Sequence, residues 1–352
     1  MTNGLFLSLL FCTFAPLLFL ACRVLPGEKW QIAAAIPTRK EMMDGQCRWR
    51  GCNLTFYGIL LATGGCLGVL VFAFLLAAAG HAGTTIIFLS GVILFFSVIA
   101  AKVIARVVEK KKNTLTVAGA ATTGLFLAPL AVFLHNRFLV SGSDPILLMP
   151  VMAALSTGYL IGEGTGRLAC LSFGCCYGKP LATTGKWMQR LLTPIACTYQ
   201  GETKKISYAS GLSGVPVVPV QALTSFFFVV TGLVGIHLYL NGRSASAFGL
   251  TAIFAMTWRL LSERWRADYR GQSRFSAYQI MGLINIVFIL FLLLILPATP
   301  VKTLRFQEGL AALWTPWTLL SFQGLWLALF LRTGLSRVTG STISFHVRHE
   351  EI

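Results

Sequence analysis

GYLIGEGTGRLACLSFGCCYGKP, residues 158–180, joins the end of an apolar helix to a turn rich in glycine and cysteine. Glu163 and Arg167 are four residues apart, so a helix places them on one face, where they can pair. A charge at the membrane boundary or just inside it costs about 2.5–3.5 kcal/mol unless it is paired or faces a polar cavity. We therefore expect a functional site at this pair. A second interpretation is that the two charges only neutralise each other or anchor to lipid head groups.

The composition is that of a polytopic membrane protein. The chain has 352 residues, of which 55% are hydrophobic and 12% charged, and its mean hydropathy is +0.73; soluble domains carry roughly 25% charged residues. The net charge of +17 comes from 29 basic and 12 acidic residues. The basic residues lie in connections between apolar stretches, which favours anionic lipid over nucleic acid as a partner.

The apolar stretches predict an all-α, polytopic transmembrane helix bundle of about eight or nine spans. Each stretch approaches the roughly 20 residues that cross a bilayer as a helix. The predicted spans are 4–22, 56–80, 84–107, 116–134, 146–168, 219–240, 247–262, 277–297 and 310–331.

Two polar connections divide this pattern. Residues 23–55 form a basic connector, which we expect to lie along the membrane surface, and residues 170–218 form a small extramembrane cap over the site. We expect three parts: an extra N-terminal helix and connector (1–52), a membrane core (53–297), and an extra C-terminal helix and tail (298–352).

A second charged cluster, WRLLSERWRADYR, occupies residues 258–270. Arg259, Glu263 and Arg266 follow one another at spacings of four and three, which predicts one helical face. Lys102 lies late in the third span. The alternative is a cytoplasmic positive collar of snorkelling side chains.

Nine cysteines show neither metal-ligand spacing nor a disulfide framework, so no metal and no cofactor are expected. Cys175 and Cys176 are either nucleophiles whose pKa is lowered by a neighbouring arginine, or small thiols packed at a tight turn.

Four blocks resemble the prolipoprotein diacylglyceryl transferase family over roughly residues 53–297. TFYGILL contains Tyr57 at the start of the first core helix, and VPVQAL retains Pro219 and Gln221. The other two blocks are GRLACLSFGCCYG, with Gly166, Arg167 and Gly178 at the family's glycine and arginine positions, and FGLTAIFAMTWRLLSERWRADYR, with Arg259, Glu263 and Arg266.

The resemblance implies a multi-pass enzyme of the bacterial inner membrane that moves a diacylglyceryl group from phosphatidylglycerol to a cysteine thiol of a lipoprotein precursor. Guanidinium groups bind phosphate bidentately and stay charged when buried, so Arg167 and Arg259 would hold the phosphate. The expected catalytic residues are Arg167, Arg259, Glu263 and Tyr57. The expected substrate-binding residues are Gly166, Gly178, Cys170, Cys175, Arg266, Lys102 and Gln221.

The chain departs from the family pattern at several polar positions, including those that would transfer protons. Cys170 and Cys175 replace an asparagine and a glutamate, Lys102 replaces an arginine, and Ala118 stands near the place of the family's essential histidine. Two alternatives therefore remain: a non-catalytic lipid-binding membrane protein that keeps the anion pocket, and a related enzyme with a different acceptor. A secondary transporter would need an internal repeat, and the sequence shows no clear one.

The charges of the connections raise a question of orientation. Successive connections between spans lie on alternate sides of the membrane. The connections on the side of the cap, with the C-terminal tail, carry 21 basic residues, and those on the other side carry 4. The positive-inside rule makes the first set cytoplasmic, whereas the resemblance implies a site on the outer face. We favour the family orientation, because the rule is least reliable for long connections.

Overall fold

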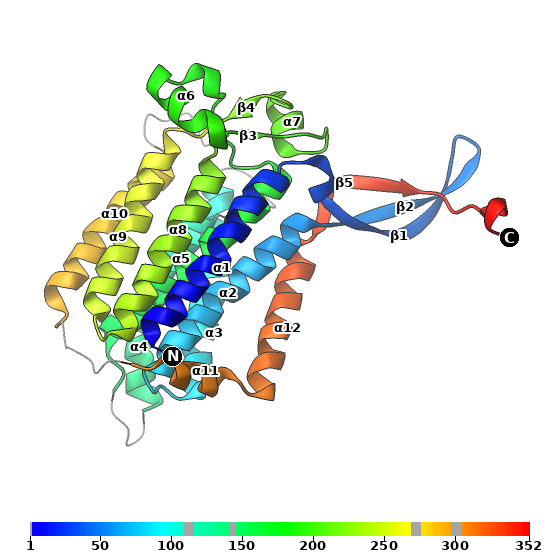
Figure 1. Cartoon of the computed structure of the whole chain (residues 1–352). Helices are drawn as coiled ribbons and strands as arrows, with labels where there is room; N and C mark the ends of the chain where they lie inside the picture. Colours follow the sequence, from blue (N-terminus) through cyan, green and yellow to red (C-terminus); the bar gives the residue numbers. More distant parts are fainter. Residues whose placement is uncertain (1, 109–115, 141–144, 269–275, 298–303) are drawn as a thin grey trace.

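The computed structural model describes residues 2–108, 116–140, 145–268, 276–297 and 304–352. The long helices stand side by side as one bundle (Figure 1). They are α1 (Asn3–Val24), α2 (Phe56–Ala78), α3 (Gly83–Val108), α4 (Val117–Phe138), α5 (Leu148–Phe173), α8 (Val220–Leu240), α9 (Ser244–Glu263), α10 (Ala277–Ile295) and α12 (Pro316–Thr333).

The predicted helical membrane bundle is confirmed, but the predicted number of spans is too high. Seven described helices are long and apolar enough to cross a membrane, and α5 and α12 are not among them. The predicted span 310–331 is interrupted, because α11 (Phe306–Leu313) ends before Thr315 caps α12 and Pro316 occupies its first turn. Helix α5 contains glycines and a charged pair, and protein rather than lipid surrounds much of it.

Helix α5 is the centre of the bundle and packs against α2, α8 and α9. Gly158, Gly162 and Gly166 recur every fourth residue and meet Gly64 and Gly68 of α2. A Cβ atom at Gly64 would lie 2.6 Å from the Gly166 nitrogen, and one at Gly158 would lie 2.6 Å from the Gly68 oxygen. Small residues at this spacing let two membrane helices approach closely. The glycines of the signature thus fix α5 against α2.

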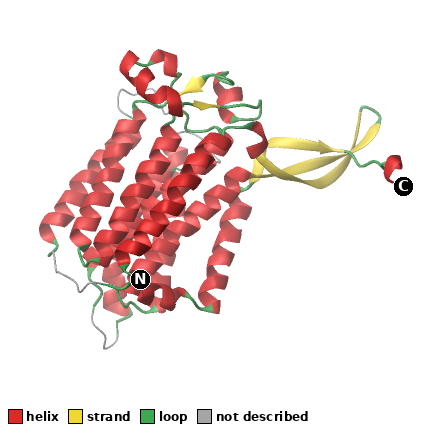
Figure 2. Cartoon of the chain, in the orientation of Figure 1, coloured by secondary structure: helices red, strands yellow, loops and turns green. Residues whose placement is uncertain are grey.

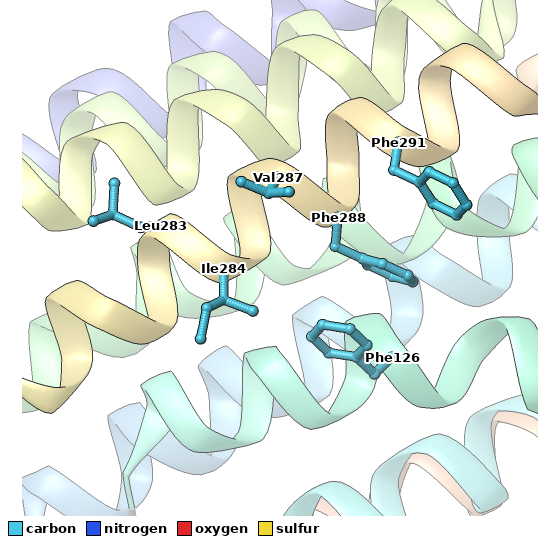
Figure 3. Close-up of a pocket in the computed structure, with 6 residues that line it drawn as sticks. All are labelled: Phe126, Leu283, Ile284, Val287, Phe288 and Phe291. Carbon is cyan, nitrogen blue, oxygen red and sulfur yellow. The ribbon is translucent and has the colours of Figure 1, made fainter.

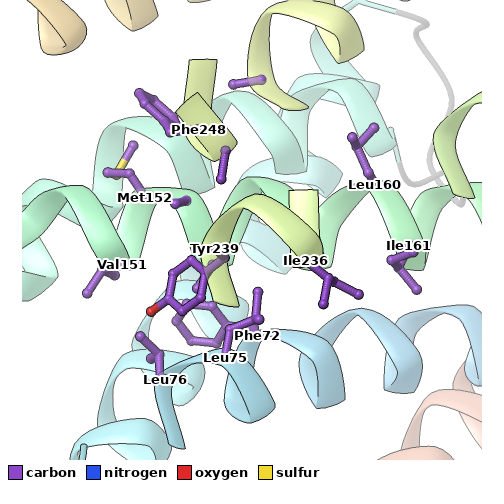
Figure 4. Packing of buried hydrophobic residues seen from close by; sticks show 14 of the residues in the cluster. Phe72, Leu75, Leu76, Val151, Met152, Leu160, Ile161, Ile236, Tyr239 and Phe248 are labelled. Carbon is purple, nitrogen blue, oxygen red and sulfur yellow. The ribbon is translucent and has the colours of Figure 1, made fainter. Parts of the chain in front are cut away.

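Large apolar side chains fill the rest of this interior (Figure 4). Phe72 and Leu75 of α2 pack near Met152 of α5, Tyr239 of α8 and Phe248 of α9. Leu75, Met152 and Phe248 are fully buried. These side chains come from four helices and lie toward the helix ends opposite the cap, so the core holds those ends together.

The predicted cap is a folded layer over one end of the bundle (Figure 1). It contains α6 (Lys186–Leu192), α7 (Lys205–Ser210) and a two-stranded sheet of β3 (Cys197–Thr198) and β4 (Pro216–Val217). Lys204 is fully buried and donates hydrogen bonds to the carbonyls of Ser172 (2.7 Å) and Leu25 (3.3 Å). The cap is thereby attached to the ends of α5 and α1.

Residues 23–55, predicted as a polar connector, contain regular structure that the prediction did not include. This region contains a long hairpin of β1 (Ile32–Met43) and β2 (Gln46–Thr55), which β5 (Leu335–Ile343) extends in the order β1-β2-β5. Asp44 and Gly45 have φ values of 50° and 72°, as a tight hairpin turn requires. The sheet projects from the bundle (Figure 2). It pairs the N-terminal hairpin with the C-terminal strand.

The terminal helices pack on the core: α1 lies against α8, and α12 lies against α2. At the end of α12 the fit is close, because a Cβ atom at Gly58 would lie 2.0 Å from the Gly334 Cα. Short 3-10 helices complete the fold at Glu28–Trp30, Leu181–Thr183, Thr193–Ile195 and His349–Glu351.

An apolar pocket of about 500 Å³ lies between α4 and α10 (Figure 3). Its lining residues are Phe126, Leu283, Ile284, Val287, Phe288 and Phe291. None of these side chains carries a polar group, so this pocket suits an acyl chain and not the chemistry of a head group.

Candidate functional site

Glu163 is the centre of a buried polar cluster at the cap end of the bundle. Its side chain is 3% exposed and accepts hydrogen bonds from three groups. Arg167, one turn later on α5, pairs with Oε1, and the Tyr159 hydroxyl, one turn earlier, donates to Oε2. Three residues at a spacing of four thus line one face of α5 with a tyrosine, a carboxylate and a guanidinium group.

Arg259 of α9 completes the cluster from a distant part of the chain. Its Nη2 lies 3.0 Å from Glu163 Oε2 and 2.5 Å from the Tyr159 hydroxyl oxygen. The side chains of Arg167 and Arg259 are only 14% and 12% exposed. One carboxylate therefore pairs with two guanidinium groups. A buried anion would balance the remaining positive charge.

Arg167 has a donor left for such an anion. Its Nε is buried and has no hydrogen-bond partner within the described part of the chain. Buried polar groups in folded proteins are nearly always paired, so an orphaned donor on a charged side chain needs a ligand or water. Guanidinium donors of this kind bind phosphate oxygens.

Arg266 lies after the end of α9, not on the helical face that the sequence predicted for it. Helix α9 ends at Glu263, so Arg259, Glu263 and Arg266 do not form one continuous helical face. Instead Arg266 forms an antiparallel bridge with Gly178 of the signature turn, and its guanidinium group binds Asp268 at 2.9 and 3.0 Å. Tyr269 and Arg270, the last residues of this charged cluster, lie outside the described residues.

The signature turn is held by backbone geometry. Gly174 ends α5 in the left-handed region at φ 69°, and the Gly174 and Cys175 amides both donate to the Cys170 carbonyl. A Cβ atom at Gly178 would lie 2.3 Å from the Val218 oxygen, so only glycine fits there. Gln221, at the start of α8, donates to the Cys175 carbonyl at 2.8 Å. These contacts fix the turn against α8 and Arg266.

Three thiols meet at this turn. The Sγ atoms of Cys170, Cys175 and Cys176 all lie within 4.8 Å of one another. The thiols of Cys170 and Cys175, followed by the charges of Arg266 and Arg167, hold the pKa of Cys176 well below its usual value. The sequence spacing does not indicate this cluster, because Cys170 is on the helix and the other two follow the turn.

The remaining predicted residues differ in position. Tyr57 packs edge-on against Phe173 with ring centroids 5.6 Å apart and interacts electrostatically with Arg167, so it lies beside the buried polar cluster. Glu263 acts on Arg259 electrostatically and is only partly buried. Gly166 contacts α2, as described above. Lys102 is exposed on α3, and none of the ion pairs within the described ranges involves it.

Sequence reasoning missed Tyr159. The signal was present, since Tyr159, Glu163 and Arg167 recur at a spacing of four on one helix. The sequence does not reveal that Arg259 of α9 contacts both Tyr159 and Glu163.

A search of curated protein sequences found no match. The family model for prolipoprotein diacylglyceryl transferase matches residues 47–295, which is more than two thirds of the chain. The chain belongs to the prolipoprotein diacylglyceryl transferase family. The match contains α2 to α5, the cap, and α8 to α10, and so all the site residues described above. In this family member, α1, α12, β1 and β5 lie outside the match and pack onto it. Membership supports a transferase-like activity on lipoprotein precursors in a membrane.

Proposed function

We propose that this protein moves a diacylglyceryl group from phosphatidylglycerol to the cysteine thiol of a lipoprotein precursor in the bacterial inner membrane. The observation that carries the proposal is the buried group of Arg167, Arg259 and Glu163, in which one carboxylate serves two guanidinium groups and Arg167 Nε is unpaired among the described residues. A phosphodiester has one negative charge and several acceptor oxygens. It therefore matches both the excess charge and the free donor.

In the proposed reaction, the acceptor sulfur attacks the glycerol carbon that carries the phosphate. A carbon–sulfur bond forms and the carbon–oxygen bond to phosphate breaks, so that glycerol phosphate leaves with the bonding electrons. The thiol proton goes to solvent or to the departing phosphate. Arg167 and Arg259 stabilise the charge that develops on the phosphate oxygens, a task for which oriented cations in a dry site contribute a few kcal/mol.

Neighbouring residues hold these two arginines in place. Glu163 and Tyr159 fix the orientation of Arg259, while Arg266 and the glycine turn form the wall on the cap side. Tyr57 would donate its hydroxyl to the lipid head group. We place the cap end at the outer face, where exported precursors arrive, although the basic connections share this end.

A second candidate is a lipid-binding protein without transfer activity. The observation that favours it is the place of the histidines. His81, His135 and His237 lie at the helix ends opposite the cap, and His346 and His349 lie in the C-terminal arm, so none reaches Arg167. Ala118, near the expected place of the family histidine, is buried on α4.

A transfer assay separates the two candidates. Purified protein is incubated with phosphatidylglycerol labelled in its acyl chains and a peptide that contains the lipoprotein cysteine motif. The enzyme transfers label to the peptide, and Arg167→Ala lowers the rate at least about a hundredfold. Arg264→Ala is the matched control, because Arg264 directly follows helix α9 but is exposed. Lipid binding without labelled peptide would establish the second candidate.

A further inference from the structure

The thiols of Cys170, Cys175 and Cys176 form a group that the phosphate site does not use. Cys175 is buried and the other two are half-buried. Their Sγ atoms lie within 4.8 Å of one another, and no other group of three potential metal ligands occurs among the described residues. Three sulfur atoms that converge from a helix end and the turn after it need an explanation beyond the filling of space.

The backbone is strained in order to bring them together. Cys176 adopts φ 58°, a left-handed conformation that is unfavourable for a non-glycine residue. The backbone of its neighbour Cys175 is held at two points: its N–H donates a hydrogen bond to the Cys170 carbonyl, and its carbonyl accepts one from the Gln221 side chain. Local strain that surrounding contacts maintain is characteristic of functional sites.

The spacing of the sulfur atoms suits a thiophilic metal ion. Zinc–sulfur bonds of about 2.3 Å in a tetrahedron place sulfur atoms about 3.8 Å apart. Because no Sγ–Sγ distance exceeds 4.8 Å, reaching this value needs a movement of about 1 Å or less, which rotation of cysteine side chains provides. Soft thiolate ligands select zinc over magnesium or calcium.

The surrounding charges match a zinc–thiolate group. Three thiolates and one Zn²⁺ have a net charge of −1, and Arg167 and Arg266 both interact electrostatically with Cys176. These guanidinium groups would stabilise the anionic complex. A lone dication at neutral ligands would be repelled by them.

We propose that Cys170, Cys175 and Cys176 bind one Zn²⁺ and leave its fourth position open. Three protein ligands with an open position are the arrangement of catalytic zinc, whereas structural zinc has four. One further step rests on the proposed transferase function: the acceptor thiol occupies the fourth position of the zinc ion. A thiol that coordinates zinc loses its proton, here to solvent, so the ion would supply the thiolate in a site without histidine. After transfer the acceptor sulfur is a neutral thioether, a weaker ligand, and it leaves.

This role is chemically preferable to a cysteine nucleophile of the chain itself. Attack by Cys175 or Cys176 on the lipid would form a carbon–sulfur bond in a stable thioether. The next thiol would then have to displace a thiolate from an unactivated carbon. Metal ligation uses the same sulfur atoms and forms no stable thioether on the chain.

The test uses the full-length protein, reduced and freed of metal by chelation, then supplied with Zn²⁺. Native mass spectrometry should find one zinc per chain, and alkylation of the wild-type protein should show protection of Cys170, Cys175 and Cys176 by zinc. Cys12 and Cys47, which are exposed, serve as internal controls and should stay equally reactive. This protection experiment does not depend on the folding of any variant.

Substitution provides a second measurement. Cys176→Ser and Cys170→Ser should each lower zinc affinity at least about tenfold, while Cys66→Ser should leave it unchanged. No bound zinc in the reduced wild-type protein, or zinc that protects none of the three thiols, would overturn the proposal. Peptide transfer by the metal-free protein would refute zinc activation but leave the transferase function intact. Zinc binding without peptide transfer would support the zinc site and refute the transferase function.

Discussion

Arg259 and Glu163 are 96 positions apart in the chain, yet Arg259 Nη2 lies 3.0 Å from Glu163 Oε2 inside the helix bundle. The contact joins α9 to α5 at the cap end. Since Glu163 also pairs with Arg167, one buried carboxylate holds both of the arginines that we assign to phosphate binding.

Replacing Glu163 with glutamine should destabilise the protein by about 3–5 kcal/mol, because two buried guanidinium groups lose the carboxylate that they share. Thermal unfolding in detergent measures this loss. Glu308→Gln is the control, since Glu308 is exposed on α11. Phosphatidylglycerol should restore more stability to Glu163→Gln than to the wild type. Equal unfolding temperatures for both variants would mean that the cluster does not stabilise the bundle.

Gly64→Ala should separate α2 from α5. The added Cβ atom would lie 2.6 Å from the Gly166 backbone nitrogen, which cannot move without the helix. Overpacking of this kind costs about 1–3 kcal/mol, and it should also lower transfer because Arg167 follows Gly166 directly. Gly91→Ala on α3 meets no atom within 4 Å and provides the matched comparison. The close-packing account fails if the two substitutions have the same effect on unfolding temperature.

Lys204 should make the attachment of the cap depend on pH. Burial lowers its pKa from 10.5 to about 8, against a smaller opposing effect of Glu28. Between pH 8 and 10.5 the unfolded state then binds more protons than the folded state, so stability rises with pH across this range. Below pH 8 both states are protonated and the slope vanishes.

Lys204→Met removes the titrating group and should flatten this pH dependence. Unfolding temperatures measured from about pH 7 to about pH 10.5 compare the variant with the wild type, and Lys186→Met, at the start of α6, is the control within the cap. A wild-type profile that falls as pH rises from 8 would contradict the assigned shift.

The membrane helices could be predicted from sequence because length and apolar composition determine them. The expected span 56–80 is α2, Phe56–Ala78, and 219–240 is α8, Val220–Leu240. Where prediction failed, other forces decide. Pro316 splits the last predicted span, and α5 is polar because protein surrounds it.

The hairpin of β1 and β2 was missed although its turn was visible. Asp44-Gly45 is a strong hairpin signal, but the flanking strands carry charges and little apolar alternation. The pairing of β2 with β5 joins Arg50 to Thr342, a separation that no local pattern reveals.

Part of the candidate site could be predicted from the sequence, and part could not. The pair of Glu163 and Arg167 follows from helical spacing, and the four family blocks identify Arg259, Arg266 and Gly178 from the sequence alone. The contact of Arg259 with Tyr159 and the meeting of three cysteines depend on how α9 and the turn fold back onto α5. Such tertiary contacts are not encoded in the spacing of residues along one segment.

The most direct test is the affinity of the purified protein for phosphatidylglycerol compared with phosphatidylcholine, measured by titration of each lipid into protein in neutral detergent. We expect the wild type and Arg264→Ala to prefer phosphatidylglycerol, and Arg167→Ala and Arg259→Ala each to lose this preference by at least about tenfold. Equal affinity of the wild-type protein for the two lipids, or an unchanged preference in both arginine variants, would contradict the assignment of these residues to the phosphate.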